Sequence, residues 1–324
     1  MGHPLLELRN VKKYFPVSGG RQLHAVDNIN LSISQGSTLG LVGESGCGKS
    51  TLGRLCIRLL EATEGEILFD GEDLRRLNRS QMHKMRSEMQ MIFQDPLACL
   101  NARRNVYELI SEPLTLNPDY WHKVEKREVT KRVIDLMDIV GLSKRFINSY
   151  PHELDGGRRQ RIGIARALAV NPKFIVCDEP VSALDVSIQA QILNLLMDLQ
   201  DEMGLTYLFI THNLSVVKHI STEVAVMYLG QCVEKAPVEE LYSNPLHPYT
   251  KALLDAIPIP RLEFRRKSSV IRGELSNPID PVPGCRFAPR CDFCTESCRG
   301  EDCQLMDMGN GHFVACTLFE KRGE

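Results

Sequence analysis

The stretch Gly43-Glu44-Ser45-Gly46-Cys47-Gly48-Lys49-Ser50-Thr51 fits the phosphate-binding pattern G-x-x-x-x-G-K-[ST] and decides the fold class. The apolar residues 38–42 before it predict a buried strand, and the leucine spacing after it predicts a helix that continues through Leu60. Glycines let such a loop wrap a phosphate chain, so that backbone N–H groups point inward at the positive end of the helix. The stretch therefore predicts a nucleotide site where Lys49 contacts the β- and γ-phosphates and Ser50 binds Mg²⁺.

Length and composition are those of an ordinary globular protein. The 324 residues suggest two domains, with 43% hydrophobic and 25% charged residues. No apolar run approaches the roughly 18 residues that a membrane span needs, and the N-terminus has no signal-peptide pattern. A net charge of −2 offers no basic surface for nucleic acid. We therefore expect a cytoplasmic protein without a nucleic-acid partner.

Apolar runs and helical patterns alternate along the chain, which predicts an α/β fold. Further strands are expected at residues 5–11, 26–33, 65–70, 89–93, 174–177 and 207–210. Polar residues follow three of them, namely Gln94, the pair Asp178-Glu179, and His212. Because ligands bind at the carboxyl ends of strands in such sheets, we expect these side chains along one edge.

Between about residues 96 and 165 the pattern becomes helical and predicts an inserted helical subdomain. One apolar face is expected on the helix that ends near Gly141, a suitable C-cap. Its members are Val124, Val129, Val133, Leu136, Met137 and Val140. Asp155 is a plausible N-cap for the next helix, which continues to Leu168.

Cleavage of a β–γ phosphoanhydride needs charge neutralisation, a metal ion and an oriented water. Lys49 and the loop amides meet the first need, and Ser50 with Asp178 meets the second. Glu179 could accept the proton of the water. The other strand-end side chains that could surround the γ-phosphate are Gln94 and His212.

Together these motifs resemble the ATP-binding cassette (ABC) family over nearly all of residues 1–260. The resemblance implies a P-loop NTPase core in which residues 43–50 are the Walker A motif and Asp178-Glu179 the Walker B motif. It also implies that Gln94 is the Q-loop glutamine and a Mg²⁺ ligand, and that His212 is the switch histidine. Residues 182–185 match the D-loop and residues 154–158 the signature. The implied nucleotide-binding residues are Gly43, Ser45, Gly46, Cys47, Gly48, Lys49, Ser50, Thr51, Asp178 and Asp185, with Asp155, Gly156 and Gly157 in the signature.

In that family two cassettes pair head to tail, and each ATP lies between one Walker A motif and the partner's signature. The resemblance implies that Phe15 stacks on the adenine, with Tyr14 as the alternative. Glu179 would be the general base and His212 a sensor of the γ-phosphate. The region from Gln94 into the helical subdomain would receive the coupling helix of a membrane subunit.

The signature departs from the usual L-S-G-G-Q, because the chain has Leu154-Asp155-Gly156-Gly157-Arg158. Asp155 would place a carboxylate where a serine hydroxyl normally meets the partner's γ-phosphate. Such a contact is unfavourable unless Arg158 or the metal offsets it. We therefore expect a heterodimer with a homologous cassette that keeps its serine.

The C-terminal part resembles the extension of oligopeptide and dipeptide importer ATPases. Residues 244–250 contain the sequence His-Pro-Tyr, and basic residues 261–267 are expected to form a linker. Six of the eleven cysteines then fall within residues 285–316. The positions that the subfamily uses are Cys285, Cys291, Cys298 and Cys316. Their loose spacing favours a [4Fe–4S] cluster over zinc or unligated thiols. A structural role is expected for it because it lies far in sequence from the nucleotide motifs.

The two resemblances imply a peripheral ATPase subunit, at the cytoplasmic face of the membrane, of an importer for di- or oligopeptides. Two transmembrane permease subunits and an extracytoplasmic peptide-binding protein would complete the transporter. The domains would comprise residues 1–260 and the extension 261–324. Two alternatives remain: an importer of nickel or another small solute, and a soluble cassette ATPase that acts on ribosomes or DNA.

Overall fold

The computed structural model describes residues 4–116, 125–257, 278–300 and 302–322. The chain divides into two compact units, one formed by residues 1–75 and 209–324 and the other by residues 76–208. We refer to them as the first and the second unit. The predicted domain boundary at residue 260 and the predicted linker 261–267 lie outside the described residues.

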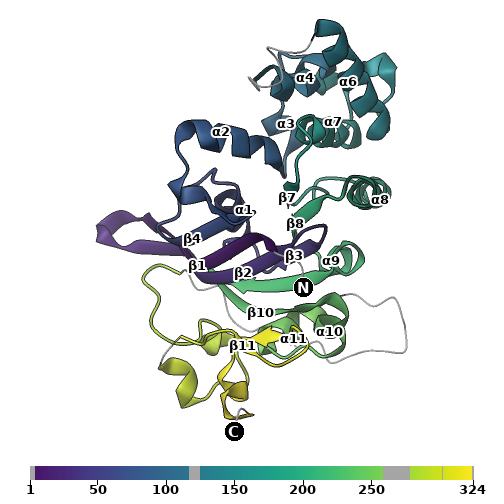
Figure 1. The fold of residues 1–324 in the computed structure, drawn as a ribbon. Helices are drawn as coiled ribbons and strands as arrows, with labels where there is room; N and C mark the ends of the chain where they lie inside the picture. Colours follow the sequence, from purple (N-terminus) through teal and green to yellow (C-terminus); the bar gives the residue numbers. More distant parts are fainter. Residues whose placement is uncertain (1–3, 117–124, 258–277, 301, 323–324) are drawn as a thin grey trace, which may run out of the picture. The chain divides into compact units, whose positions relative to one another are not determined.

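An antiparallel sheet of four strands in the order β2-β1-β4-β5 opens the first unit (Figure 1). Its strands are β1 (Pro4–Pro16), β2 (Gln22–Ser34), β4 (Glu64–Phe69) and β5 (Glu72–Asp73). β1 and β2 pair closely enough to set Tyr14 opposite His24 and Phe15 opposite Leu23. Since neighbouring residues of a strand point to opposite faces, Tyr14 and Phe15 face different surroundings.

The strand before the phosphate-binding loop, β3 (Thr38–Val42), is buried along its whole length, as its apolar sequence predicts. It pairs in parallel with β9 (Glu223–Tyr228), and β10 (Gln231–Pro237) continues this sheet in antiparallel. The C-terminal part adds β12 (Phe313–Val314) to β10, and β11 (Met306–Asp307) to β12. The extension therefore adds two short strands to the sheet that contains β3, the strand before the phosphate-binding loop.

The helices of the first unit are α1 (Lys49–Cys56), α9 (Leu214–Ile220), α10 (Val238–Ser243) and α11 (Pro248–Asp255). Its 3-10 turns are η1 (Ser18–Gly20), η5 (Ala288–Arg290), η6 (Glu296–Arg299) and η7 (Thr317–Arg322). The prediction that the first helix reaches Leu60 is wrong. Arg58 adopts a positive φ of 50°, and the N–H groups of Leu59 and Leu60 both turn back to the Arg54 carbonyl. The chain leaves the helix there, and Leu59 is 48% exposed.

In the second unit, β6 (Met89–Ile92) pairs in parallel with β7 (Phe174–Asp178). Its helices are α2 (Arg79–Glu88), α3 (Pro96–Cys99), α4 (Val106–Leu116), α6 (Lys126–Ile139), α7 (Gly156–Leu168) and α8 (Val186–Met203), with 3-10 turns η3 (Lys144–Phe146) and η4 (Pro151–Glu153). Two elements, η2 (Leu74–Arg76) and β8 (Thr206–Ile210), include the residues where the chain passes between units.

The helices α4, α6 and α7 pack together in the second unit (Figure 1). Val129, Val133, Leu136 and Met137 form the buried face of α6, and Gly141 follows the helix with φ +65°. The predicted member Val124 lies outside the described residues. Among the described residues, no helix is long and apolar enough to cross a membrane.

One hydrophobic cluster of the first unit joins the phosphate-loop strand to the extension. Val42 at the end of β3 belongs to it, and so do Tyr228, Tyr249 and Phe287, all of them buried. Cys285 and Cys291 pack against its edge. The cysteine-containing segment therefore shares a core with the strand that carries the phosphate-binding loop.

Candidate functional site

Two glycines let the phosphate-binding loop lie directly against neighbouring strands. Gly43 has φ +152°, and a Cβ there would be 2.2 Å from the carbonyl oxygen of Met227. Gly48 has φ +105°, and its Cβ would be 2.0 Å from the carbonyl oxygen of Ala25. Any side chain at either position would collide with backbone, so the loop needs glycine at both for this path.

Lys49 begins α1, and its side chain is buried, with the residue only 5% exposed. Its Nζ donates hydrogen bonds to the carbonyl oxygens of Gly43 and Glu44, at 2.7 and 2.9 Å. Ser50 and Thr51 occupy the first turn of the same helix, where anions are stabilised. The ammonium group therefore lies inside the loop, where a phosphate chain would meet it.

The middle of the loop contains both solvent-facing and buried positions. Ser45 and Gly46 are exposed, whereas Cys47 is buried, and burial raises the pKa of its thiol. The buried Cys47 thiol is therefore neutral, and the exposed residues Ser45 and Gly46 are the part of the loop that a ligand can reach.

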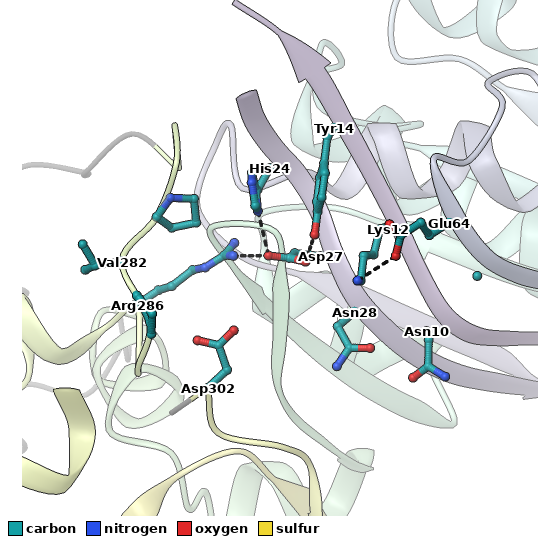
Figure 2. A pocket seen from close by; sticks show the side chains of 13 residues that line it. Asn10, Lys12, Tyr14, His24, Asp27, Asn28, Glu64, Val282, Arg286 and Asp302 are labelled. Atoms are coloured by element: carbon teal, nitrogen blue, oxygen red, sulfur yellow. Dashed lines mark hydrogen bonds and ion pairs between the residues drawn. The ribbon is translucent and has the colours of Figure 1, made fainter. Parts of the chain in front are cut away.

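The two candidate adenine aromatics are placed differently. Tyr14 stacks on His24 with ring centroids 3.8 Å apart, and its hydroxyl donates to Asp27 (Figure 2). Phe15, on the opposite face of β1, is half-buried beneath the Lys13 ammonium at 5.0 Å. Tyr14 is thus engaged in a hydrogen-bonded group of its own.

That group lines a polar pocket of about 470 Å³ in the first unit (Figure 2). Asp27 accepts hydrogen bonds from Tyr14 and Arg286, and its Oδ2 lies 3.0 Å from His24 Nδ1. Burial alone would raise the pKa of Asp27, but these three partners outweigh burial and lower it. Arg286 also donates to the Leu229 carbonyl, so each terminal nitrogen of this buried guanidinium has an acceptor.

In the second unit the structure brings two predicted catalytic residues together. Gln94 Nε2 donates to Glu179 Oε2 at 3.1 Å; Glu179 directly follows β7, and Gln94 comes two residues after the end of β6. Asp178 ends β7 and is 3% exposed. Glu179 adopts φ +46°, a left-handed conformation that costs a non-glycine residue energy. Ser182 stabilises this bend by donating to the Glu179 carbonyl at 3.1 Å.

Asp155 caps α7, as the sequence predicted. Its Oδ1 accepts the backbone N–H of Arg158 at 2.8 Å, and its Oδ2 lies 2.8 Å from Arg158 Nη1. The guanidinium of Arg158 also lies over the Phe146 ring, 4.7 Å from its centroid. The Asp155 carboxylate is therefore paired with an arginine of its own helix.

The glycines of the signature lie close to the D-loop and to α8. A Cβ on Gly156 would come within 3.0 Å of the Leu184 side chain, and one on Gly157 within 2.8 Å of Ile188. Asp185 precedes α8 and is exposed, without a side-chain capping bond. In the first unit, His212 follows β8 and is exposed.

The four predicted thiol ligands converge on one small cavity. Cys285, Cys291, Cys298 and Cys316 all line it, whereas Cys294 and Cys303 do not. Burial raises the pKa of three of these thiols; at Cys298 hydrogen bonds involving Thr295 and Thr317 outweigh burial and lower it. Within the described ranges, however, no three His, Cys, Asp or Glu side chains have an arrangement that could hold a metal ion. The donors are suited to a soft metal, but they are not in ligating positions.

A buried carboxylate that no sequence pattern indicates anchors the His-Pro-Tyr segment. Glu234 accepts the N–H groups of Leu246 and His247, at 2.7 and 3.0 Å, and lies 2.8 Å from His312 Nε2. Burial lowers the pKa of His247 to about 4, so this histidine is neutral and its Nδ1 accepts the N–H of Tyr249. An acidic residue in an apparently ordinary strand gives no sequence signal of this role.

Two family models match the chain. The model described as ABC transporter matches residues 26–182, and the model for the C-terminal region of oligopeptide/dipeptide transporters matches residues 233–298.

Curated relatives match nearly the whole chain. The oligopeptide transport ATP-binding protein AppF of Bacillus subtilis is 49% identical over 97% of this chain and 97% of its own. The oligopeptide transport ATP-binding protein OppF of Salmonella typhimurium is 49% identical over 96% and 95%. The dipeptide transport ATP-binding protein DppF of Haemophilus influenzae is 47% identical over 97% and 96%.

Solved cassette structures share the fold. A dimeric structure of the ATP-binding cassette MJ0796 bound to ADP and Pi has a TM-score of 0.66 and 30% identity, and covers 72% of this chain and 98% of its own. The cassette cbiO1 from Clostridium perfringens has a TM-score of 0.65 and 29% identity over 74% of this chain and 91% of its own. From these similarities, this chain belongs to the ATP-hydrolysing ABC transporter family, and it carries the C-terminal region of oligopeptide and dipeptide transporters.

Proposed function

We propose that this chain is the ATPase subunit of an importer that takes up dipeptides or oligopeptides across the cytoplasmic membrane. The observation that carries the proposal is similarity along nearly the whole chain, extension included, to ATP-binding proteins of peptide transport. The comparisons favour neither the nickel importer nor the soluble cassette ATPase. The chain would act at the cytoplasmic face of the membrane as a peripheral subunit.

The proposed reaction is hydrolysis of the β–γ bond of ATP. Lys49 and the loop amides would hold the phosphates, and Phe15 would stack on the adenine. Glu179, oriented by Gln94 at 3.1 Å, would accept the proton of the attacking water. His212 would contact the γ-phosphate. When bound by Ser50 and Gln94, Mg²⁺ would supply neutralisation of phosphate charge.

The proposed partners are a homologous cassette, two membrane permeases and, through them, an extracytoplasmic peptide-binding protein. The Q-loop region offers exposed apolar side chains for a permease, since Phe93 and Leu97 are 36% and 47% exposed. The exchange of serine for Asp155 supports a heterodimer, in which the partner contributes an intact signature. The Asp155–Arg158 pair reduces the repulsion that Asp155 would impose on a phosphate.

For the extension we propose a [4Fe–4S] cluster held by Cys285, Cys291, Cys298 and Cys316, with zinc as the alternative. Their shared cavity supports this ligand set over one with Cys294 or Cys303. Ligation would require the four thiols to move into a common geometry around the metal.

The test is to co-express the chain with its permeases and its partner cassette, purify the complex and reconstitute it into vesicles with the binding protein. We expect ATP-dependent uptake of short peptides, and peptides bound to the purified binding protein. Uptake of nickel without peptide uptake would contradict the substrate assignment. Purification of the chain with ribosomes instead of permeases would contradict the transport function.

A further inference from the structure

The cysteine-containing segment contacts the phosphate-binding loop directly, although 246 residues separate the two partners. Arg290 Nη1 and Nη2 donate to the two carboxylate oxygens of Glu44, at 2.8 and 3.2 Å. Both side chains are largely buried, with exposed fractions of 8% and 21%. A bidentate arginine–carboxylate pair fixes the orientation of both groups as well as their distance. The cysteine segment is therefore far from the nucleotide motifs in the sequence but in direct contact with the phosphate-binding loop in the structure.

We propose that the loop from Cys285 to Cys291, here called the cysteine loop, positions the phosphate-binding loop for ATP. Arg290 is the positioning residue, and it acts through Glu44. The inference rests on the assignment of residues 43–51 as the ATP phosphate site.

Glu44 is held at its main chain as well as its side chain. Its N–H donates to the hydroxyl of Tyr249, at 2.9 Å, and Tyr249 is fully buried. Tyr249 belongs to the His-Pro-Tyr segment, which therefore acts on the same residue as Arg290. With two independent anchors, the peptide group at Glu44 has a fixed direction.

The orientation of the Glu44 peptide group matters because this group is a hydrogen-bond partner of Lys49. The carbonyl oxygen of Glu44 accepts a hydrogen bond from Lys49 Nζ at 2.9 Å. Rotation of Glu44 would move this acceptor together with the neighbouring amides of the loop. A loop that already has its binding geometry loses less conformational entropy on binding, which increases affinity.

The cysteine loop is a firm support for Arg290. Phe287 packs edge-on against Tyr228 and at a tilt against Tyr249, with centroid distances of 5.3 and 5.4 Å. Arg290 itself donates to the Tyr228 hydroxyl at 3.3 Å.

A second arginine secures the other side of the cysteine loop. Arg286 bonds to the Leu229 carbonyl and to Asp27 of β2, the strand paired with the aromatic end of β1 (Figure 2). The loop therefore contacts both the phosphate-binding loop and the strand pair that carries Phe15.

The test is a double-mutant cycle on the full-length chain, read as the Kd of a fluorescent ATP analogue. Glu44→Gln and Arg290→Met should each weaken binding by on the order of tenfold, within the usual range of coupling between sites. Together they should cause no further loss, because they remove the same contact. Arg290→Lys, which keeps the charge without the bidentate geometry, should restore part of the affinity.

Arg299→Met is the matched control, since Arg299 is an exposed arginine of the same extension. It should leave the Kd unchanged. The unfolding temperature without nucleotide is measured for every variant, and Tyr249→Phe replaces Arg290→Met if the latter does not fold. Unchanged affinity in the single variants, or losses that multiply in the double variant, would overturn the inference. Failure of the wild-type chain to bind ATP would instead contradict the proposed function.

Discussion

The phosphate-binding loop and the signature segment are stabilised in opposite ways. The first is held by distant parts of the chain, since Tyr249 and Arg290 lie 205 and 246 residues beyond Glu44. The second satisfies its carboxylate within one helical turn, where Asp155 accepts from Arg158 three residues later.

Because of this difference, a structural change in each segment is expected to affect a different phosphate site. In our proposal a change at the cysteine loop reaches the phosphate-binding loop of the same chain through Glu44, whereas Asp155 is bonded to Arg158 at the start of α7 and would act on the phosphate site of the partner. The departure of Asp155 from the usual serine is therefore a local solution: the aspartate caps its helix as well as a serine would, and its charge has a partner.

The largest effect is expected within the phosphate-binding loop. Lys49→Ala removes the buried ammonium that meets the phosphates, and we expect ATP affinity to fall on the order of a hundredfold, as for loss of a strong charge-assisted contact. Glu179→Gln is the control, because it should preserve binding and affect turnover alone. Equilibrium binding of a fluorescent ATP analogue distinguishes the two. Equal affinity in Lys49→Ala and the wild type would refute the phosphate-site assignment.

The next prediction concerns the cysteines of the extension, whose segment contacts the phosphate-binding loop. Anaerobically purified chain should be brown, with iron and labile sulfide near four each per chain if the cluster is [4Fe–4S]. Serine at Cys285, Cys291, Cys298 or Cys316 should abolish the colour, and serine at Cys294 or Cys303 should preserve it. Absorption spectra with metal and sulfide analysis provide the measurement. Stoichiometric zinc without sulfide, in protein kept from oxygen and chelators, would contradict the [4Fe–4S] assignment and show that the site holds zinc.

A smaller effect is expected at the signature. Two unit charges about 4 Å apart at an effective dielectric near 20 interact by about 4 kcal/mol, an upper limit that Arg158 and Mg²⁺ reduce. Asp155→Ser should raise turnover at the partner's site in the assembled complex several-fold. A tenfold gain would correspond to the removal of about 1.4 kcal/mol of repulsion in the transition state.

Asp155→Asn separates charge from hydroxyl at the same position, since asparagine also caps helices well. If repulsion is the cause, Asn and Ser should restore turnover equally, as single-site kinetics with the other base disabled would show. No gain with either variant would mean that Asp155 does not limit that site.

The smallest effect concerns the pH dependence of the extension. Burial would lower the pKa of His312, but Glu234 of β10 and Glu240 of α10 outweigh burial and raise it. A raised folded-state pKa gives stability that is fully present below the unfolded value of 6.5 and is lost as pH rises through the folded value. His312→Gln should lack this dependence. Unfolding temperatures at about pH 6 and pH 9 provide the check; parallel profiles of the two proteins would disprove it.

The sequence was most informative where local patterns determine structure. Residues 43–51, the cap at Asp155 and the buried strands β3 and β7 follow from spacing and apolar runs alone. The end of α1 was mispredicted because a positive φ at Arg58 leaves no compositional signal. The short strands β11 and β12 have only two residues each, too few for any period.

Long-range partners were beyond sequence reasoning. Nothing in the spacing of Glu44 and Arg290 indicates a pair, because an ion pair between distant segments is fixed by the fold and not by a local pattern. Likewise, Glu234 has the appearance of an ordinary surface glutamate, although it is fully buried.

We propose that this chain supplies the complete catalytic half of an asymmetric cassette pair. The most direct test compares ATP turnover of the assembled transporter after base-to-glutamine substitution in each cassette separately. We expect Glu179→Gln to reduce turnover by on the order of 10²–10⁴-fold at its site and so to abolish most of the total. The equivalent substitution in the partner should matter much less. Equal losses from the two substitutions would contradict the asymmetric account.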